Sequence, residues 1–104
     1  METYLQTAWG DQWENITMDI VKKAIEGLRE MDGEHVAFWV GLIKEDENVL
    51  EVSKDLCLIG TFEDELDFQY KGQGKDWKEI ESLFGSFLSD NHSTIKRRLK
   101  RVEK

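Results

Sequence analysis

The chain lacks several residue types and patterns that would assign it to common protein classes. Its 104 residues include no proline and one cysteine, Cys57. Without proline, the chain lacks one turn-forming residue and one source of slow folding phases. A single cysteine cannot form an internal disulfide, which fits a reducing compartment. Because the surrounding LCLIG contains no His or Lys to activate a thiol, we expect Cys57 to be a small buried hydrophobic residue, not a nucleophile.

Long apolar runs and targeting segments are also missing. The longest apolar stretch, residues 36–43, is far too short to span a bilayer. The start, METYLQTAW, lacks the basic and apolar regions of a secretory signal. We therefore expect a cytoplasmic protein that has no contact with the membrane.

Basic residues are scarce relative to acidic ones. The chain has 14 Lys and Arg against 22 Asp and Glu, a formal net charge of −8. This charge disfavours nonspecific binding to nucleic acid or anionic membranes and favours a cationic partner. The hydrophobic content of 39% and aromatic content of 11% are typical of a folded protein. The length suits a single domain over residues 1–104.

The chemistry of enzymes and metal sites has little support in the sequence. His35 and His92 lie far apart, and zinc would need more nitrogen or sulfur ligands than these two. An acid pair such as Glu63 and Asp67 would need a pocket that perturbs its pKa values. KEDEN lacks the spaced ligands of a calcium loop, and GQGK lacks the rest of a phosphate loop. We expect no enzyme activity, no metal and no cofactor.

Hydrophobic periodicity predicts an α+β fold. Apolar residues at three- and four-residue steps predict amphipathic helices, and Asp76 and Glu79 form a capping-box pattern before the second one. The run HVAFWVGLI is apolar on both faces, typical of a central strand covered on each side. The expected elements are helices at residues 17–31, 77–88 and 93–102 and strands at residues 35–43, 49–53, 56–62 and 66–71.

Short turns between these strands predict an antiparallel β-meander of three to five strands. We expect the N-terminal helix and one or two C-terminal helices to pack on this sheet. Residues 3–9 alternate weakly and predict an edge strand, which would permit a weak dimer of an otherwise monomeric protein.

Charge is distributed unevenly along the chain. Residues 30–67 contain twelve acidic and two basic residues, net −10, whereas residues 92–104 contain six basic and one acidic, net +5. Alternate turns of a meander lie at the same end of the sheet. The acidic turns KEDEN and FEDELD therefore share one end if Lys54-Asp55 is a hairpin turn, and lie at opposite ends if it is a bulge.

The acidic turns and two aromatic neighbours are the candidate partner-binding site. One interpretation is that the acids are merely solvated. The other is that a cationic partner relieves their mutual repulsion and is attracted by their field. Phe62 and Tyr70 would be exposed anchors, since aromatics ringed by charge are typical of binding hot spots. The candidate residues are Glu45, Asp46, Glu47, Phe62, Glu63, Asp64, Glu65, Asp67 and Tyr70.

The basic tail, which includes KRRLKR, has two interpretations. On a helix its bases could contact the phosphates of a nucleic acid. We favour the other interpretation, in which the bases complement the helix dipole and lie against the acidic remainder of the chain. Six bases on a net-acidic domain would bind nucleic acid weakly at physiological salt.

Several segments resemble immunity proteins of bacterial polymorphic-toxin and contact-dependent growth inhibition systems. They are the opening Trp13-Glu14-Asn15-Ile16, the helix ending AIEGL…MDG at residues 24–33, and the strands at residues 49–52 and 66–70. The resemblance covers roughly the first seventy residues and implies a small cytoplasmic α+β domain that binds one cognate toxin domain. The family assigns no role to an individual residue.

The resemblance implies a function that the charge distribution also favours. Toxins of these systems are frequently nucleases with cationic clefts, which an acidic inhibitor would occlude. We therefore predict an immunity protein that neutralises a basic, nuclease-like toxin domain. The alternatives are a non-toxin interaction adaptor that uses the same face and a weakly RNA-associated protein that uses the basic C-terminal helix.

Overall fold

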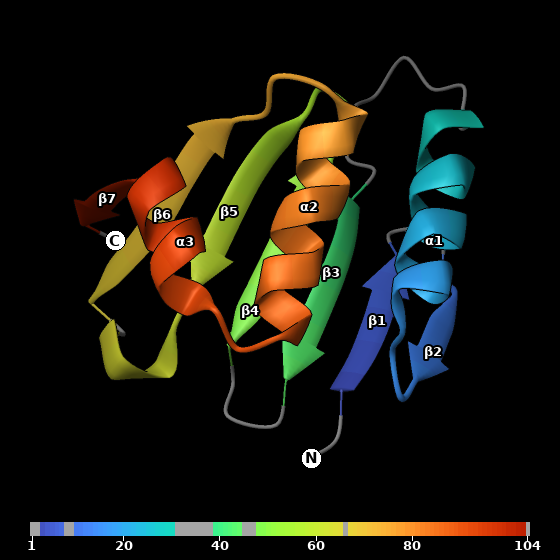
Figure 1. Ribbon diagram of the computed structural model, residues 1–104, viewed down its shortest axis with the longest axis horizontal. Coiled ribbons are helices and arrows are strands. Elements are labelled where there is room, and N and C mark those ends of the chain that lie inside the picture. The colour runs from blue at the N-terminus through green and yellow to red at the C-terminus, as the bar shows by residue number, and fades with distance from the viewer. Residues whose placement is uncertain (1–2, 8–9, 31–38, 45–47, 66, 104) are drawn as a thin grey trace.

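The computed structural model describes residues 3–7, 10–30, 39–44, 48–65 and 67–103 (Figure 1). In this part of the chain, seven strands form one antiparallel sheet in the order β2-β1-β3-β4-β5-β6-β7. The elements are β1 (Thr3–Thr7), β2 (Gln12–Glu14), α1 (Met18–Glu30), β3 (Trp39–Lys44), β4 (Val49–Ser53), β5 (Cys57–Thr61), the 3-10 helix η1 (Glu63–Glu65), β6 (Phe68–Gln73), α2 (Trp77–Leu88), α3 (His92–Arg98) and β7 (Lys100–Glu103).

All three α-helices lie on one face of the sheet (Figure 1). Burial alternates accordingly along β4, where Leu50 and Val52 are fully buried while Val49 and Glu51 are partly exposed. The core residues are Leu5, Ile16, Val21, Ala24, Ile25, Leu28, Leu50, Val52, Leu58, Phe62, Tyr70, Ile80, Leu83, Phe84, Phe87, Ile95 and Leu99. No described element covers the other face. The side chains of the strand over residues 35–43, which we expect to be covered on each side, lie outside the described residues.

The predicted α+β class is confirmed, and the sheet is wider than the predicted meander. The strands β3 to β6 form the meander, and β1, β2 and β7 extend it. The prediction of an edge strand at residues 3–9 is wrong, because β1 lies between β2 and β3. Residues 35–38, the start of the strand predicted over residues 35–43, lie outside the described residues. No described helix is long and apolar enough to cross a membrane.

The C-terminal segment differs from the predicted helix over residues 93–102. The helix α3 ends at Arg98, Leu99 has an extended backbone, and Lys100–Glu103 then pairs with β6. Leu99 is buried over Gly72, where a Cβ atom would lie only 2.6 Å from Leu99 Cδ2. The close approach of Leu99 to this glycine stabilises the extended path, which helical periodicity alone does not reveal.

The residues around Lys54 and Asp55 form a hairpin turn. Strands β4 and β5 pair in antiparallel register with Val52 opposite Leu58. The Leu56 N–H donates to Ser53 O at 3.0 Å, and Leu56 has a positive φ of 69°. A left-handed residue closing a short turn is a common hairpin geometry. The C-terminal ends of β3 and β5 therefore lie at the same end of the sheet.

Candidate partner-binding end of the sheet

The 3-10 helix η1 carries three acidic residues at the end of β5. Its first residue, Glu63, donates its backbone N–H to Asn48 Oδ1 at 2.9 Å. Asn48 directly precedes β4, so this bond joins the start of β4 to the start of η1. Glu45, Asp46 and Glu47 lie outside the described residues, but the chain that follows them is bonded to η1.

Three of the four described acidic candidates are open to solvent. Glu63, Asp64 and Asp67 are exposed, and the side chain of Asp64 is 74% exposed. Glu65 is half-buried, with 22% of its side chain exposed. We call Glu63, Asp64, Glu65 and Asp67 the acidic end.

The basic tail pairs with the acidic end. Lys96 Nζ lies 2.8 Å from Glu65 Oε2 and 3.4 Å from Asp64 Oδ1, and Arg101 Nη1 lies 3.3 Å from Glu65 Oε1. The Tyr70 hydroxyl also donates to Glu65, at 2.8 Å. The hydrogen bonds from Lys96 and then Tyr70 lower the pKa of Glu65 to about 2. These contacts confirm that the tail lies against the acidic part of its own chain.

The prediction that Phe62 and Tyr70 are exposed anchors is wrong. Phe62 is 1% exposed and Tyr70 is 7% exposed. The two rings meet edge to face with centroids 5.6 Å apart, and Phe62 also contacts the rings of Phe87 and His92. Lys96 Nζ lies 4.8 Å from the Phe62 ring centroid, within the range of a cation–π interaction. The end of α2 and the helix α3 cover these rings. No local sequence pattern around Phe62 predicts these contacts.

The tail leaves part of the negative charge uncompensated. Lys96 and Arg101 both pair with Glu65, and Lys96 also pairs with Asp64. Glu63 and Asp67 form no ion pair with any described residue. Within the described part of the chain, the acidic end therefore keeps two exposed, unpaired carboxylates beside the partly paired Asp64.

A different carboxylate is fully engaged at the opposite end of the sheet. Arg98 Nε and Nη2 each lie 2.8 Å from an oxygen of Glu79, and the Lys75 N–H also donates to Glu79 at 2.8 Å. The hydrogen bond from Arg98 is the largest cause that lowers the pKa of Glu79 to about 2. The Asp76 carboxylate accepts from the Glu79 N–H, which confirms the predicted cap of α2.

Sequence reasoning did not identify the individual residues that bond to the acidic end, Asn48, Lys96 and Arg101. The excess of bases in the tail pointed in general terms to Lys96 and Arg101 as internal partners, but no local pattern identified Asn48. Cys57, expected to be buried, is only half-buried because it alternates with Leu58 on β5 and lies on the helix-free face. No group of three or more His, Cys, Asp or Glu among the described residues could hold a metal ion.

Comparisons with protein families, with curated proteins and with solved structures found no match to this chain. What the protein binds must therefore be inferred from the position, exposure and charge of its own residues. The acidic end offers anionic groups for electrostatic recognition, whereas Phe62 and Tyr70 are packed inside the domain.

Proposed function

We propose that this chain is an immunity protein that binds and neutralises a cognate cationic toxin domain of the nuclease type by occluding its active site. The observation that carries the proposal is the acidic end, where Glu63 and Asp67 are exposed and unpaired within the described part of the chain. The bond between Asn48 and Glu63 holds the start of β4 at the same end. Glu45, Asp46 and Glu47 lie outside the described residues.

The charge at this end supports an electrostatic mechanism of inhibition. Carboxylates held close together repel one another, and a cationic cleft would relieve that repulsion on binding. The same field attracts a basic partner before contact and can raise its association rate by about 10- to 1000-fold at low salt. A nuclease cleft that binds phosphates is cationic, so exposed carboxylates are suited to compete with its substrate.

The pairing of the tail favours a protein partner over RNA. Lys96, Arg98 and Arg101 are engaged with acidic residues of the same chain. A nucleic acid would have to displace these ion pairs before its phosphates could bind the three basic side chains. An adaptor that binds a basic protein other than a toxin through the same end remains the second candidate function. Under the first proposal the protein acts in the cytoplasm, where the delivered nuclease would find its substrate.

The proposal is tested by the toxin domain that it requires. The partner to try first is the variable C-terminal domain of a large secreted protein encoded directly upstream of this gene. That domain should arrest growth when expressed alone, and co-expression of this chain should restore growth. The purified chain should also abolish nuclease activity of the domain at a one-to-one ratio. Continued growth arrest with both proteins present, or full nuclease activity in a saturated mixture, would overturn the proposal.

A further inference from the structure

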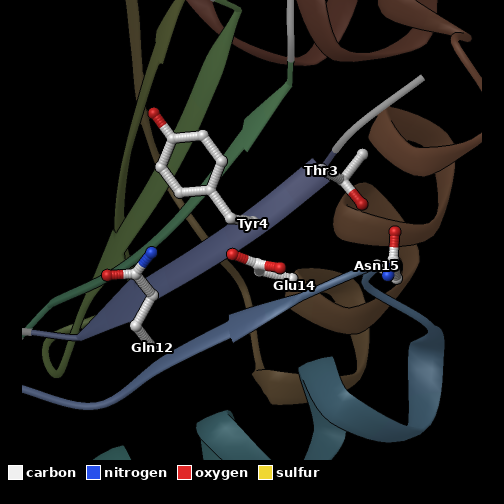
Figure 2. A pocket seen from close by; sticks show the side chains of 5 residues that line it. All are labelled: Thr3, Tyr4, Gln12, Glu14 and Asn15. Atoms are coloured by element: carbon white, nitrogen blue, oxygen red, sulfur yellow. The ribbon is translucent and has the colours of Figure 1, made fainter.

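A pocket of about 280 Å³ lies at the β1–β2 hairpin, outside the acidic end defined above. Its lining residues are Thr3, Tyr4, Gln12, Glu14 and Asn15. Figure 2 shows the Glu14 carboxyl group in the middle of these side chains, with Tyr4 and Gln12 to one side and Thr3 and Asn15 to the other. The pocket is smaller than the roughly 300–1,000 Å³ of sites for drug-sized ligands, so its size suits a single side chain.

Tyr4, Gln12 and Glu14 of the pocket project to the helix-free face of the sheet. Tyr4 pairs directly with Glu14 across the two strands, and side chains of directly opposed residues project to the same side. Tyr4 alternates along β1 with the fully buried Leu5, which faces the helices. The hairpin is fixed beside the pocket, because the N–H groups of Asn15 and Ile16 donate to Thr3 O and Oγ1, each at 2.9 Å.

The described lining of this pocket carries negative charge. Among the described lining residues Glu14 is the one carboxylic acid and none is basic, and Glu14 forms no ion pair with another described residue. A second hollow, between β2 and α1, differs in this respect because Lys23 lies among its acidic lining residues Asp11, Glu26 and Glu30. The first pocket therefore offers a carboxylate, amide and hydroxyl oxygens and an aromatic ring to a cation.

The register of the sheet brings the pocket to the same end as η1. Tyr4 pairs with residue 43, residue 43 with Val49, and Val49 with Thr61, two residues before Glu63. From β1 to β5 this row crosses three strand spacings, about 14 Å. One protein partner can therefore reach both the pocket and the acidic end, since specific interfaces bury about 800 Å² on each side.

We propose that this pocket receives an arginine side chain of the cationic partner. A guanidinium group is planar and presents a fork of N–H donors that pairs with a carboxylate through two parallel hydrogen bonds. Glu14 supplies that carboxylate, Gln12 and Asn15 supply further acceptor oxygens, and the Tyr4 ring supplies a face on which the group can stack. The proposal rests on the proposed function for the identity of the partner, but the chemistry of the pocket can be tested without it.

The first test titrates the isotope-labelled chain with N-acetyl-arginine amide and follows backbone amide shifts by NMR. We expect saturable shifts at Thr3, Tyr4, Glu14 and Asn15. N-acetyl-citrulline amide, the neutral isostere, should produce none, and N-acetyl-lysine amide should bind more weakly. Glu14→Gln should weaken arginine binding about tenfold or more, as expected for the loss of a charged hydrogen-bonding partner. Glu26→Gln, an exposed acid on α1, is the matched control and should bind like the unaltered chain.

Three results would overturn the arginine pocket. They are the absence of saturable shifts, equal shifts from the citrulline or lysine derivative, and arginine binding that survives Glu14→Gln. The second test measures the affinity of the Glu14→Gln chain for the toxin domain. A complex that forms with unchanged affinity contradicts the pocket and leaves the immunity function standing. Arginine binding without any toxin complex supports the pocket and contradicts the immunity function.

Discussion

The two ends of the sheet each contain a carboxylate paired with the C-terminal segment, and they differ in the acidic residues that lie beside that carboxylate. At the opposite end, Arg98 and the Lys75 N–H satisfy Glu79, which completes the start of α2. At the acidic end, Lys96 and Arg101 both form ion pairs with Glu65, and the exposed Glu63 and Asp67 pair with neither base. The comparison shows that the basic tail stabilises the fold at both ends. Glu63 and Asp67, which are exposed beside Glu65 and form no ion pair with a described residue, are the candidates for binding.

The comparison also changes how the tail should be tested. If residues 93–104 formed a free helix, deleting them would show whether the tail is needed for binding to RNA. Ile95 is fully buried, Leu99 is 6% exposed, and β7 pairs with β6. Such a deletion would therefore remove part of the core, so point substitutions are needed at each end.

The largest expected effect is that of Phe62→Ala beneath the acidic end. Removing a fully buried Phe leaves a cavity among Tyr70, Phe87 and His92 and should lower the free energy of unfolding by about 3–5 kcal/mol. Urea unfolding followed by circular dichroism measures the loss. Phe68→Ala is the control, because Phe68 is only half-buried and should lose less than half as much. Equal free energies of unfolding for Phe62→Ala and the unaltered chain would contradict the burial of Phe62 and indicate that it is exposed.

A smaller effect is expected when the opposite end loses its paired base. Arg98→Ala removes two charged hydrogen bonds to Glu79 and one to Gln73 O, and should cost about 1 kcal/mol in the free energy of unfolding. Arg97→Ala, on the same helix, is the comparison, since the described contact of Arg97 is one hydrogen bond to Ser93 O at 3.3 Å. Urea midpoints that fall equally in both variants would contradict the structural role of Arg98.

The two paired carboxylates should make the fold sensitive to acid. Glu65 and Glu79 have pKa values of about 2 in the folded chain against an ordinary 4.5. Their contribution is present above pH 4.5 and is lost as the pH falls toward 2, because the unfolded chain then binds more protons. The double variant Glu65→Gln/Glu79→Gln should therefore lose less stability over that interval. Thermal unfolding in a pH series checks this, and parallel curves would count against both pairings.

The smallest effect is expected on the helix-free face, at the central strand β4. Partial burial raises the pKa of Glu51, so its ionised form is slightly unfavourable in the folded state. Glu51→Gln should raise the free energy of unfolding at pH 7, by about 0.5 kcal/mol or less. The gain should disappear below the ordinary pKa, where the Glu51 carboxyl group is protonated in both states. A loss of stability at pH 7 would indicate a favourable contact of the carboxylate.

Local patterns predicted most elements because their causes are local. The capping pattern of Asp76 and Glu79 and the apolar spacing after it gave α2 with its observed bounds, Trp77–Leu88. The strand β7 was missed because its path depends on the contact of Leu99 with Gly72, 27 residues earlier in the sequence. For the same reason the burial of Phe62 was missed, since the rings and helix that cover it come from residues 87–96. The acidic residues of the acidic end could be predicted, because the charge of a residue follows directly from its type.

The central claim is that the exposed carboxylates of Glu63 and Asp67 at the acidic end attract a cationic partner. Its most direct test is the association rate with the toxin domain at low and high salt for two variants of equal charge. Glu63→Lys/Asp67→Lys alters the acidic end, whereas Glu26→Lys/Glu30→Lys alters exposed acids toward the far end of α1. We predict that the first variant associates at least about tenfold more slowly at low salt and that the difference shrinks at high salt. Equal rates for the two variants at low salt would contradict the claim.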